Sequence, residues 1–136
     1  MTFTACTSGG GDVDLVAESR GDVGSARLVG YSAHCVAEAS AAFRRGADHV
    51  SLSPIFAPVS KPSTLRPLGI EGLHVACESL DGPVYALGGV REDCVDELRR
   101  AGASGVAVIG ALLGAADPAR SARELAAPWV RSSGDR

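Results

Sequence analysis

Short apolar runs alternate with helical patterns along most of the chain, and this alternation limits the folds that the sequence can adopt. Apolar runs at 27–31, 49–53, 84–87 and 105–109 are each followed by a segment whose apolar residues recur at helical spacing. Strands that alternate with helices of this length form parallel sheets through right-handed crossovers. The sequence therefore predicts an α/β fold with four βα units, and a weaker fifth unit that starts with a strand at 2–6.

The strand predicted at 49–53 has two different faces. Val50 and Leu52 alternate with Ser51 and Ser53, and alternate residues of a strand point to opposite sides of the sheet. We expect the apolar pair to face covering helices. The serines then face the other side and leave room for a ligand there.

Capping residues set the expected helix ends. We expect the helix after the first of these strands to begin at Ser32 or His34, and further helices to cover 70–80 and 91–101. Asp117 has the chemistry of an N-cap, with Pro118 at the first helical position. The last helix then runs to about residue 130.

One domain accounts for the whole chain of 136 residues. Within it we expect a weakly patterned segment at 1–26, the βα units at 27–130 and a frayed tail at 131–136. The net charge of -3 includes no basic patch, which disfavours a nucleic-acid partner. No apolar run approaches the ~20 residues that span a bilayer, and the four cysteines form no CxxC motif. We expect a cytoplasmic protein with semi-buried thiols.

Glycines follow the last two predicted strands. Gly88 and Gly89 end one strand, and Gly110 and Ala111 follow the next. Without side chains, such positions let an anion approach backbone N–H groups at a helix start. The same residues also suit a tight turn. Because two such turns occur together, we favour a phosphate site formed by both, with a phosphorylated small molecule as the ligand.

A loop of 16 residues at 54–69 carries Lys61, the only lysine of the chain, directly after Ser60. Loops of this length in compact domains are usually functional or disordered. A lysine there can stabilise the charge of a leaving pyrophosphate, although a solvated surface lysine is the common alternative. At the end of an earlier strand, Ser32 can donate to a phosphate oxygen, whereas we favour a structural role for His34.

These motifs together resemble the C-terminal half of the thiamine-phosphate synthase and TenI superfamily. The weaker segment GGGDVDL near the start resembles the family's LGxxDL. The stronger matching segments are 30–34 (GYSAH), 46–56 (GADHVSLSPIF), 60–61 (SK), 67–69 (PLG), 86–90 (ALGGV) and 101–113 (AGASGVAVIGALL).

The resemblance implies that the chain is part of a (β/α)₈ barrel of the TIM type. It also implies a transferase that joins a hydroxymethylpyrimidine pyrophosphate to a thiazole phosphate, with Mg²⁺ and loss of pyrophosphate. By the same resemblance, Ser32, Ser60 and Lys61 would face the pyrophosphate as catalytic residues. Gly89 and Gly110 would face the thiazole phosphate, with Gly88, Ala111 and Ser53 beside the ligands.

The chain departs from the family pattern at several places. A complete barrel takes about 250 residues, and the missing first half carries the family's Mg²⁺-binding aspartates, so the ligands of that ion are not found in this chain. The family's Thr-x-Thr/Ser-Lys appears as Pro58, Val59, Ser60 and Lys61, and Pro54 replaces the catalytic histidine of TenI proteins.

Three interpretations therefore stay open. The chain is an enzyme or enzyme half of the thiamine-phosphate synthase type, a non-catalytic or regulatory binder of thiazole or thiamine phosphate, or a truncated inactive homologue. In every case a partial barrel exposes two sheet edges and an inner face. Such a chain can pair with a copy of itself, complete a barrel with a partner half-barrel, or rearrange into an open sheet, and we expect self-association.

Overall fold

A computed structural model describes residues 3–5, 12–57 and 64–130. Its five strands form one sheet in which every neighbouring pair is parallel and the spatial order follows the chain order. The α/β fold and the four expected βα units are confirmed. The weaker fifth unit is also present, because the first strand pairs with the second. The strands are β1 (Phe3–Ala5), β2 (Leu28–Ala33), β3 (His49–Leu52), β4 (Val84–Leu87) and β5 (Gly105–Ala107).

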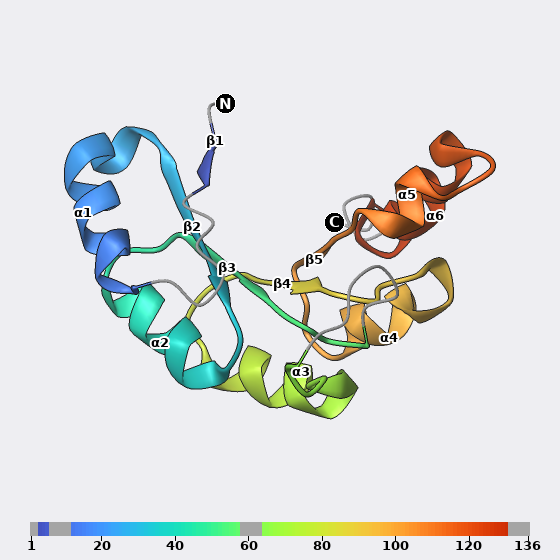
Figure 1. Cartoon of the computed structure of the whole chain (residues 1–136), viewed down its shortest axis with the longest axis horizontal. Coiled ribbons are helices and arrows are strands. Elements are labelled where there is room, and N and C mark those ends of the chain that lie inside the picture. The colour runs from blue at the N-terminus through green and yellow to red at the C-terminus, as the bar shows by residue number, and fades with distance from the viewer. Residues whose placement is uncertain (1–2, 6–11, 58–63, 131–136) are drawn as a thin grey trace.

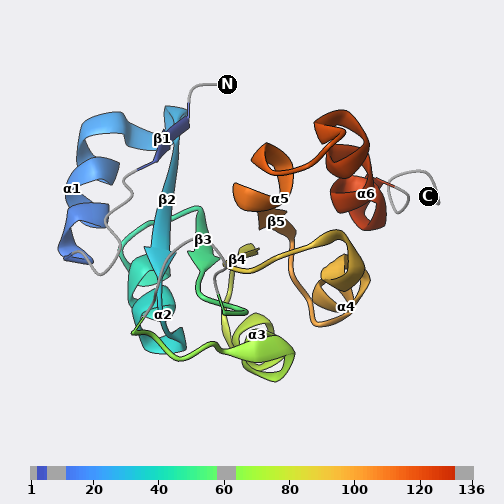
Figure 2. The same ribbon diagram turned by 45° about the vertical axis from the view of Figure 1, so that its right-hand side comes forward.

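The helices follow the strands around the outside of a curved sheet (Figure 1). The other face of the sheet is concave, and Figure 2 shows it open between β1 and β2 at one edge and α5 at the other. A doubly wound fold would reverse its strand order and cover both faces of the sheet. The chain is instead an arc of a TIM-type barrel. Its helices are α1 (Asp14–Val23), η1 (Gly24–Ala26), α2 (Val36–Arg44), α3 (Gly69–Ser79), η2 (Glu92–Cys94), α4 (Val95–Arg100), α5 (Gly110–Leu113) and α6 (Pro118–Val130).

The start of α2 corrects the sequence prediction. The helix begins at Val36 rather than at Ser32 or His34, because β2 continues to Ala33. Ser32 pairs with Ser51 and Ala33 with Leu52 across the sheet. This long-range pairing outweighs the local signals for an earlier helix.

Two further boundaries differ from the prediction, and one agrees. The segment expected as one helix at 91–101 divides into η2 and α4, and the strand expected at 105–109 ends at Ala107. The cap of α6 is confirmed, since Asp117 Oδ1 accepts a hydrogen bond of 3.0 Å from the Arg120 N–H. None of the described helices has the length and apolar character that a membrane crossing requires.

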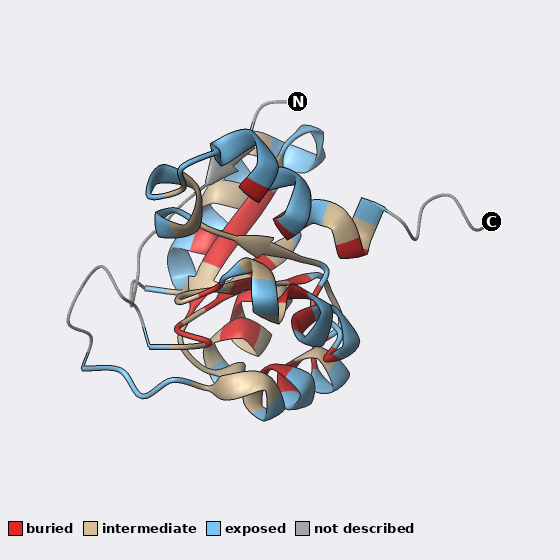
Figure 3. Cartoon of the chain, turned by 90° about the vertical axis from the view of Figure 1, so that its right-hand side faces the viewer, coloured by how far each residue is buried: buried red, intermediate tan, exposed pale blue. Residues whose placement is uncertain are grey.

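The core lies between the sheet and its covering helices, and Figure 3 shows the buried residues concentrated there. Val50 and Leu52 are fully buried on this side, whereas Ser51 and Ser53 keep partial exposure. The predicted two-faced strand is therefore confirmed. Other buried residues of this core include Val29, Tyr31, Ala33, Leu73, Ala76, Val84, Ala86, Val95, Leu98 and Leu125.

Two aromatic rings cover the amino ends of the strands on the concave face. The rings of His49 and Tyr85 meet edge to face, with centroids 5.6 Å apart. A Cβ added to Gly30 would collide with the His49 ring, and one added to Gly105 would come within 2.8 Å of Tyr85 Cε1. Each ring therefore lies across a neighbouring strand that has no side chain at that level.

Candidate functional site

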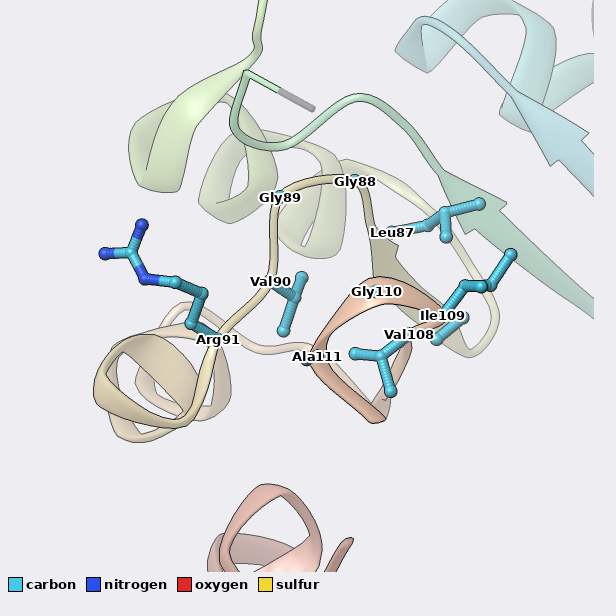
Figure 4. Close-up of a pocket in the computed structure, with 10 residues that line it drawn as sticks. Leu87, Gly88, Gly89, Val90, Arg91, Val108, Ile109, Gly110 and Ala111 are labelled. Carbon is cyan, nitrogen blue, oxygen red and sulfur yellow. The ribbon is translucent and has the colours of Figure 1, made fainter. Parts of the chain in front are cut away.

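A pocket of about 370 Å³ lies between the two glycine turns at the carboxyl ends of β4 and β5 (Figure 4). Residues 87–91 and 107–111 line it. The structure therefore brings the predicted phosphate residues Gly88, Gly89, Gly110 and Ala111 together around one space. In parallel α/β folds, ligands bind at this end of the strands.

Gly88 and Gly89 have a packing reason to be glycine. Their φ angles are +95° and +64°, and residues that have a side chain rarely adopt positive φ angles. A Cβ on Gly88 would lie 3.0 Å from Pro54 Cα, and one on Gly89 would lie 2.8 Å from the Ala57 carbonyl oxygen. The turn therefore needs these glycines to let segment 54–57 pass closely, whether or not an anion binds.

The base of the loop after β3 is tied to the pocket by backbone hydrogen bonds. Segment 54–57 donates to the end of β4 and accepts from the start of α3. The N–H groups of Ile55 and Phe56 donate to the carbonyls of Leu87 (2.9 Å) and Gly88 (3.0 Å). The N–H groups of Leu68 and Gly69 donate to the carbonyls of Pro54 and Ile55, both at 2.9 Å. The predicted catalytic residues Ser60 and Lys61 lie outside the described residues.

Gly110 has no such packing reason. Its φ lies outside the left-handed region, and an added Cβ would meet no atom within 4 Å. The residue is exposed and starts α5, so its N–H and that of Ala111 precede the first intrahelical hydrogen bonds. Because α5 has only four residues, its dipole is small, and the attraction for an anion comes from these N–H groups.

Arg91 is a pocket residue that the sequence did not reveal. It follows the Gly88–Gly89 turn and is the cation in the pocket wall. Its guanidinium donates to Asp93 at 3.1 and 3.2 Å, and this hydrogen-bonded carboxylate raises the pKa of Arg91. Figure 4 shows the guanidinium turned away from Gly110. Its only sequence signal was its position two residues after the glycines.

Ser32 lies near the carboxyl end of β2 and His34 directly follows this strand, at the same end of the sheet as the glycine turns. Ser32 lies on the concave face with its backbone beside Ser51. The His34 Nδ1 lies 2.9 Å from the Ser53 carbonyl oxygen and 3.4 Å from Ser53 Oγ, and the His34 N–H donates to Glu38 at 2.8 Å. The contacts with Ser53 link the ends of β2 and β3, and the bond to Glu38 links the end of β2 to α2, in agreement with a structural role for His34. Ser53 is thus held at the end of β3 by His34, directly before the segment that passes the Gly88–Gly89 turn.

The described part of the chain contains no cluster of side chains that could bind Mg²⁺. Within residues 12–57 and 64–130, no three His, Cys, Asp or Glu side chains come together as metal ligands do. Since Mg²⁺ binds mainly through carboxylates and phosphates, the described residues do not fit a site built by the protein alone.

The sequence model of the family described as thiamine monophosphate synthase matches residues 9–112. This chain belongs to that family. A thiamine-phosphate synthase from Anaeromyxobacter dehalogenans is 45% identical over 120 residues, which cover 88% of this chain and 54% of the relative. The thiamine-phosphate synthase from Chloroflexus aurantiacus is 40% identical over 101 residues, which cover 74% of this chain and 47% of that protein.

Solved structures give the same result for the fold. A thiamine phosphate pyrophosphorylase from Pyrococcus furiosus superimposes with a TM-score of 0.77 at 27% identity, over 95% of this chain and 59% of that one. A 3-hexulose-6-phosphate synthase reaches a TM-score of 0.69 at 26% identity, with 91% and 60% covered. The family resemblance seen in the motifs is therefore confirmed. This member of the thiamine monophosphate synthase family spans about half the length of the curated relatives it matches.

Proposed function

We propose that this chain forms the phosphate-binding part of a thiamine-phosphate synthase-type transferase. The ligand is the phosphate of a thiazole phosphate or of thiamine phosphate, held between the Gly88–Gly89 turn and the Gly110–Ala111 turn. The observation that carries the proposal is the open position at Gly110, which faces the pocket without a steric need for glycine. A bare backbone there lets phosphate oxygens reach N–H donors.

The proposed reaction is the joining of a pyrimidine pyrophosphate to the thiazole phosphate, with loss of pyrophosphate. Ser32, Ser60 and Lys61 are proposed to face the pyrophosphate, where the lysine offsets the charge of the leaving group. Ser53 is proposed to contact ligand from the end of β3. The cytoplasm is the proposed location, because the three described cysteines are free thiols, as is common in a reducing compartment.

Binding can be tested by the rise in melting temperature that thiazole phosphate produces. A ligand at 100 times its Kd stabilises a protein by about 2.7 kcal/mol. Gly110→Asp places a carboxylate in the open position and should abolish the rise without strain in the fold. Gly21→Asp is the matched control, because Gly21 also has nothing within 4 Å of an added Cβ and lies in α1. Equal rises for wild type and Gly110→Asp would refute the phosphate site.

Catalysis needs a separate assay. The chain is supplied with both phosphorylated substrates and Mg²⁺, alone and with the N-terminal half of a relative, and thiamine phosphate is measured. Product in either case supports the transferase. Phosphate binding without product in both cases would leave the non-catalytic binder as the function, and neither binding nor product would indicate an inactive homologue.

We further propose that the chain associates through its open sheet edge at β5. In the described part of the chain, β1 and β5 each pair on one side only. Three large apolar side chains near β5 are mostly exposed: Ile109 (70%), Leu113 (83%) and Val130 (68%). Exposed apolar groups beside an unpaired edge favour association with a second copy or with a partner half-barrel. A monomer by light scattering at micromolar concentration, with no binding of an apolar dye, would overturn this proposal.

A further inference from the structure

One buried hydroxyl connects the two sides of the phosphate pocket. Ser121 in α6 is only 5% exposed, and among the described residues it is the one polar residue that is buried. Its Oγ contacts the Glu92 carboxylate and lies 3.1 Å from the Ala111 carbonyl oxygen. Buried polar groups are rarely retained without a partner, and here both partners belong to the segments that follow β4 and β5.

The two partners lie just behind the glycine turns. Glu92 starts η2, three residues after Gly89, and Ala111 is the second residue of α5, next to Gly110. Neither Glu92 nor Ser121 lines the pocket itself. The hydroxyl therefore joins the two turns from their rear side, away from the space where a ligand would sit.

The Ala111 carbonyl is available because α5 ends early. The Gly114 N–H donates to Gly110 at 3.0 Å, and the next N–H, that of Ala115, donates to Leu112 at 3.3 Å. Helix ends leave such carbonyls for side chains or water. The Ser121 hydroxyl takes this place for Ala111.

The Glu92 carboxylate makes the contact strong. The hydrogen bond from Ser121 lowers the pKa of Glu92, so the group is ionised at neutral pH, and hydrogen bonds to charged acceptors exceed neutral ones in strength. The hydroxyl has one hydrogen to share between the Glu92 carboxylate, which follows the first turn, and the Ala111 carbonyl of the second. Both segments are thereby drawn to the same oxygen atom of α6.

We propose that Ser121 is a positioning residue that fixes the distance between the Gly88–Gly89 and Gly110–Ala111 turns for binding of one phosphate. This inference rests on the proposed phosphate site. Because both turns line one pocket, a phosphate bound there would take N–H donors from each, and its affinity would depend on the spacing between the turns. Loss of the hydroxyl leaves each turn intact and allows their separation to vary.

The test measures the Kd of inorganic phosphate by calorimetry and the melting temperature without ligand. We expect Ser121→Ala to weaken phosphate binding about threefold to tenfold, the equivalent of one ordinary hydrogen bond, and Ser121→Thr to restore most of it. Ser79→Ala is the matched control, because Ser79 also donates from a helix to a backbone carbonyl, at 2.7 Å, but lies in α3.

The outcomes separate the inference from the proposed function. Phosphate binding by wild type with an unchanged Kd in Ser121→Ala would overturn the positioning role and leave the phosphate site standing. No phosphate binding by wild type would overturn both. A lower melting temperature alone, with the Kd unchanged, would show a purely structural serine. If Ser121→Ala does not fold, Glu92→Ala removes the other end of the contact, and an unchanged Kd there refutes the proposal equally.

Discussion

Arg20 attaches the N-terminal segment to the rest of the sheet, and its replacement tests whether residues 12–26 belong to one domain with the βα units. From α1 its guanidinium reaches three backbone carbonyls and one carboxylate. Nε and Nη2 donate to Gly46 O at 3.0 and 2.9 Å, and Nη1 donates to Gly24 O at 2.6 Å and Arg27 O at 2.9 Å. Nη2 also pairs with Asp48.

The size of the effect follows from these contacts. Each of the three carbonyls loses a hydrogen bond worth about 0.5–1.5 kcal/mol, and a partly exposed ion pair adds about 0–1 kcal/mol. The Arg20 side chain is 25% exposed, so folding restricts its rotamers. Alanine has no rotamers to lose, and this offsets the loss of stability by roughly 1–2 kcal/mol. We expect Arg20→Ala to lower the free energy of unfolding by about 2 kcal/mol. For a domain of this size, that is a fall of roughly 6–10 °C in melting temperature.

Chemical denaturation followed by circular dichroism measures this loss. Arg20→Lys keeps the charge but cannot reach three carbonyls, so it should recover less than half of the loss. Arg99→Ala is the control, since Arg99 is exposed on α4 and surface changes of this kind stay within about 0.5 kcal/mol. If Arg20→Ala were as stable as Arg99→Ala, the N-terminal segment would not be docked as described, and the single domain would be wrong.

Other parts of the fold give three further predictions. Burial alone would raise the pKa of Asp48, but the hydrogen bonds from the Val29 N–H and from Arg20 lower it below the ordinary 3.8. The ionised Asp48 therefore stabilises the fold, and the loss of stability caused by Asp48→Asn at pH 7 should become smaller as the pH falls below about 4. A difference in stability between wild type and Asp48→Asn that stays constant with pH would contradict this. Gly30→Ala should destabilise the fold by about 1–3 kcal/mol through overpacking against His49, and a double-mutant cycle with His49→Ala should show coupling, not additivity. Asp117→Ala should cost about 1 kcal/mol in urea unfolding through loss of the α6 cap, whereas no change would mean that water replaces it.

The strands were the most predictable part of the fold. Their apolar runs are short, mostly adjoin glycine or proline, and precede helical patterns, so local signals and tertiary pairing agree. The end of β2 was less predictable, because Ser32 and Ala33 become strand residues only by pairing with Ser51 and Leu52. No local property of the sequence encodes that pairing.

The site was predicted in outline but not in its supporting contacts. The two glycine turns were found from their positions after strands, yet the need for Gly88 and Gly89 comes from the close approach of segment 54–57, which depends on the folded chain. Ser121 carried no signal at all, because a serine in an amphipathic helix is ordinary until its neighbours are known. Arg91 was also missed, since a single arginine after a strand is common on protein surfaces.

The chain order of the strands has a consequence for how the protein folds. Each strand pairs with the one before it, so no strand has to insert between two that have already met. A growing chain can therefore add β3 to β2, and then β4 to β3, as each leaves the ribosome. The same property allows a sheet of this kind to be lengthened at either edge without disturbing the pairs already formed.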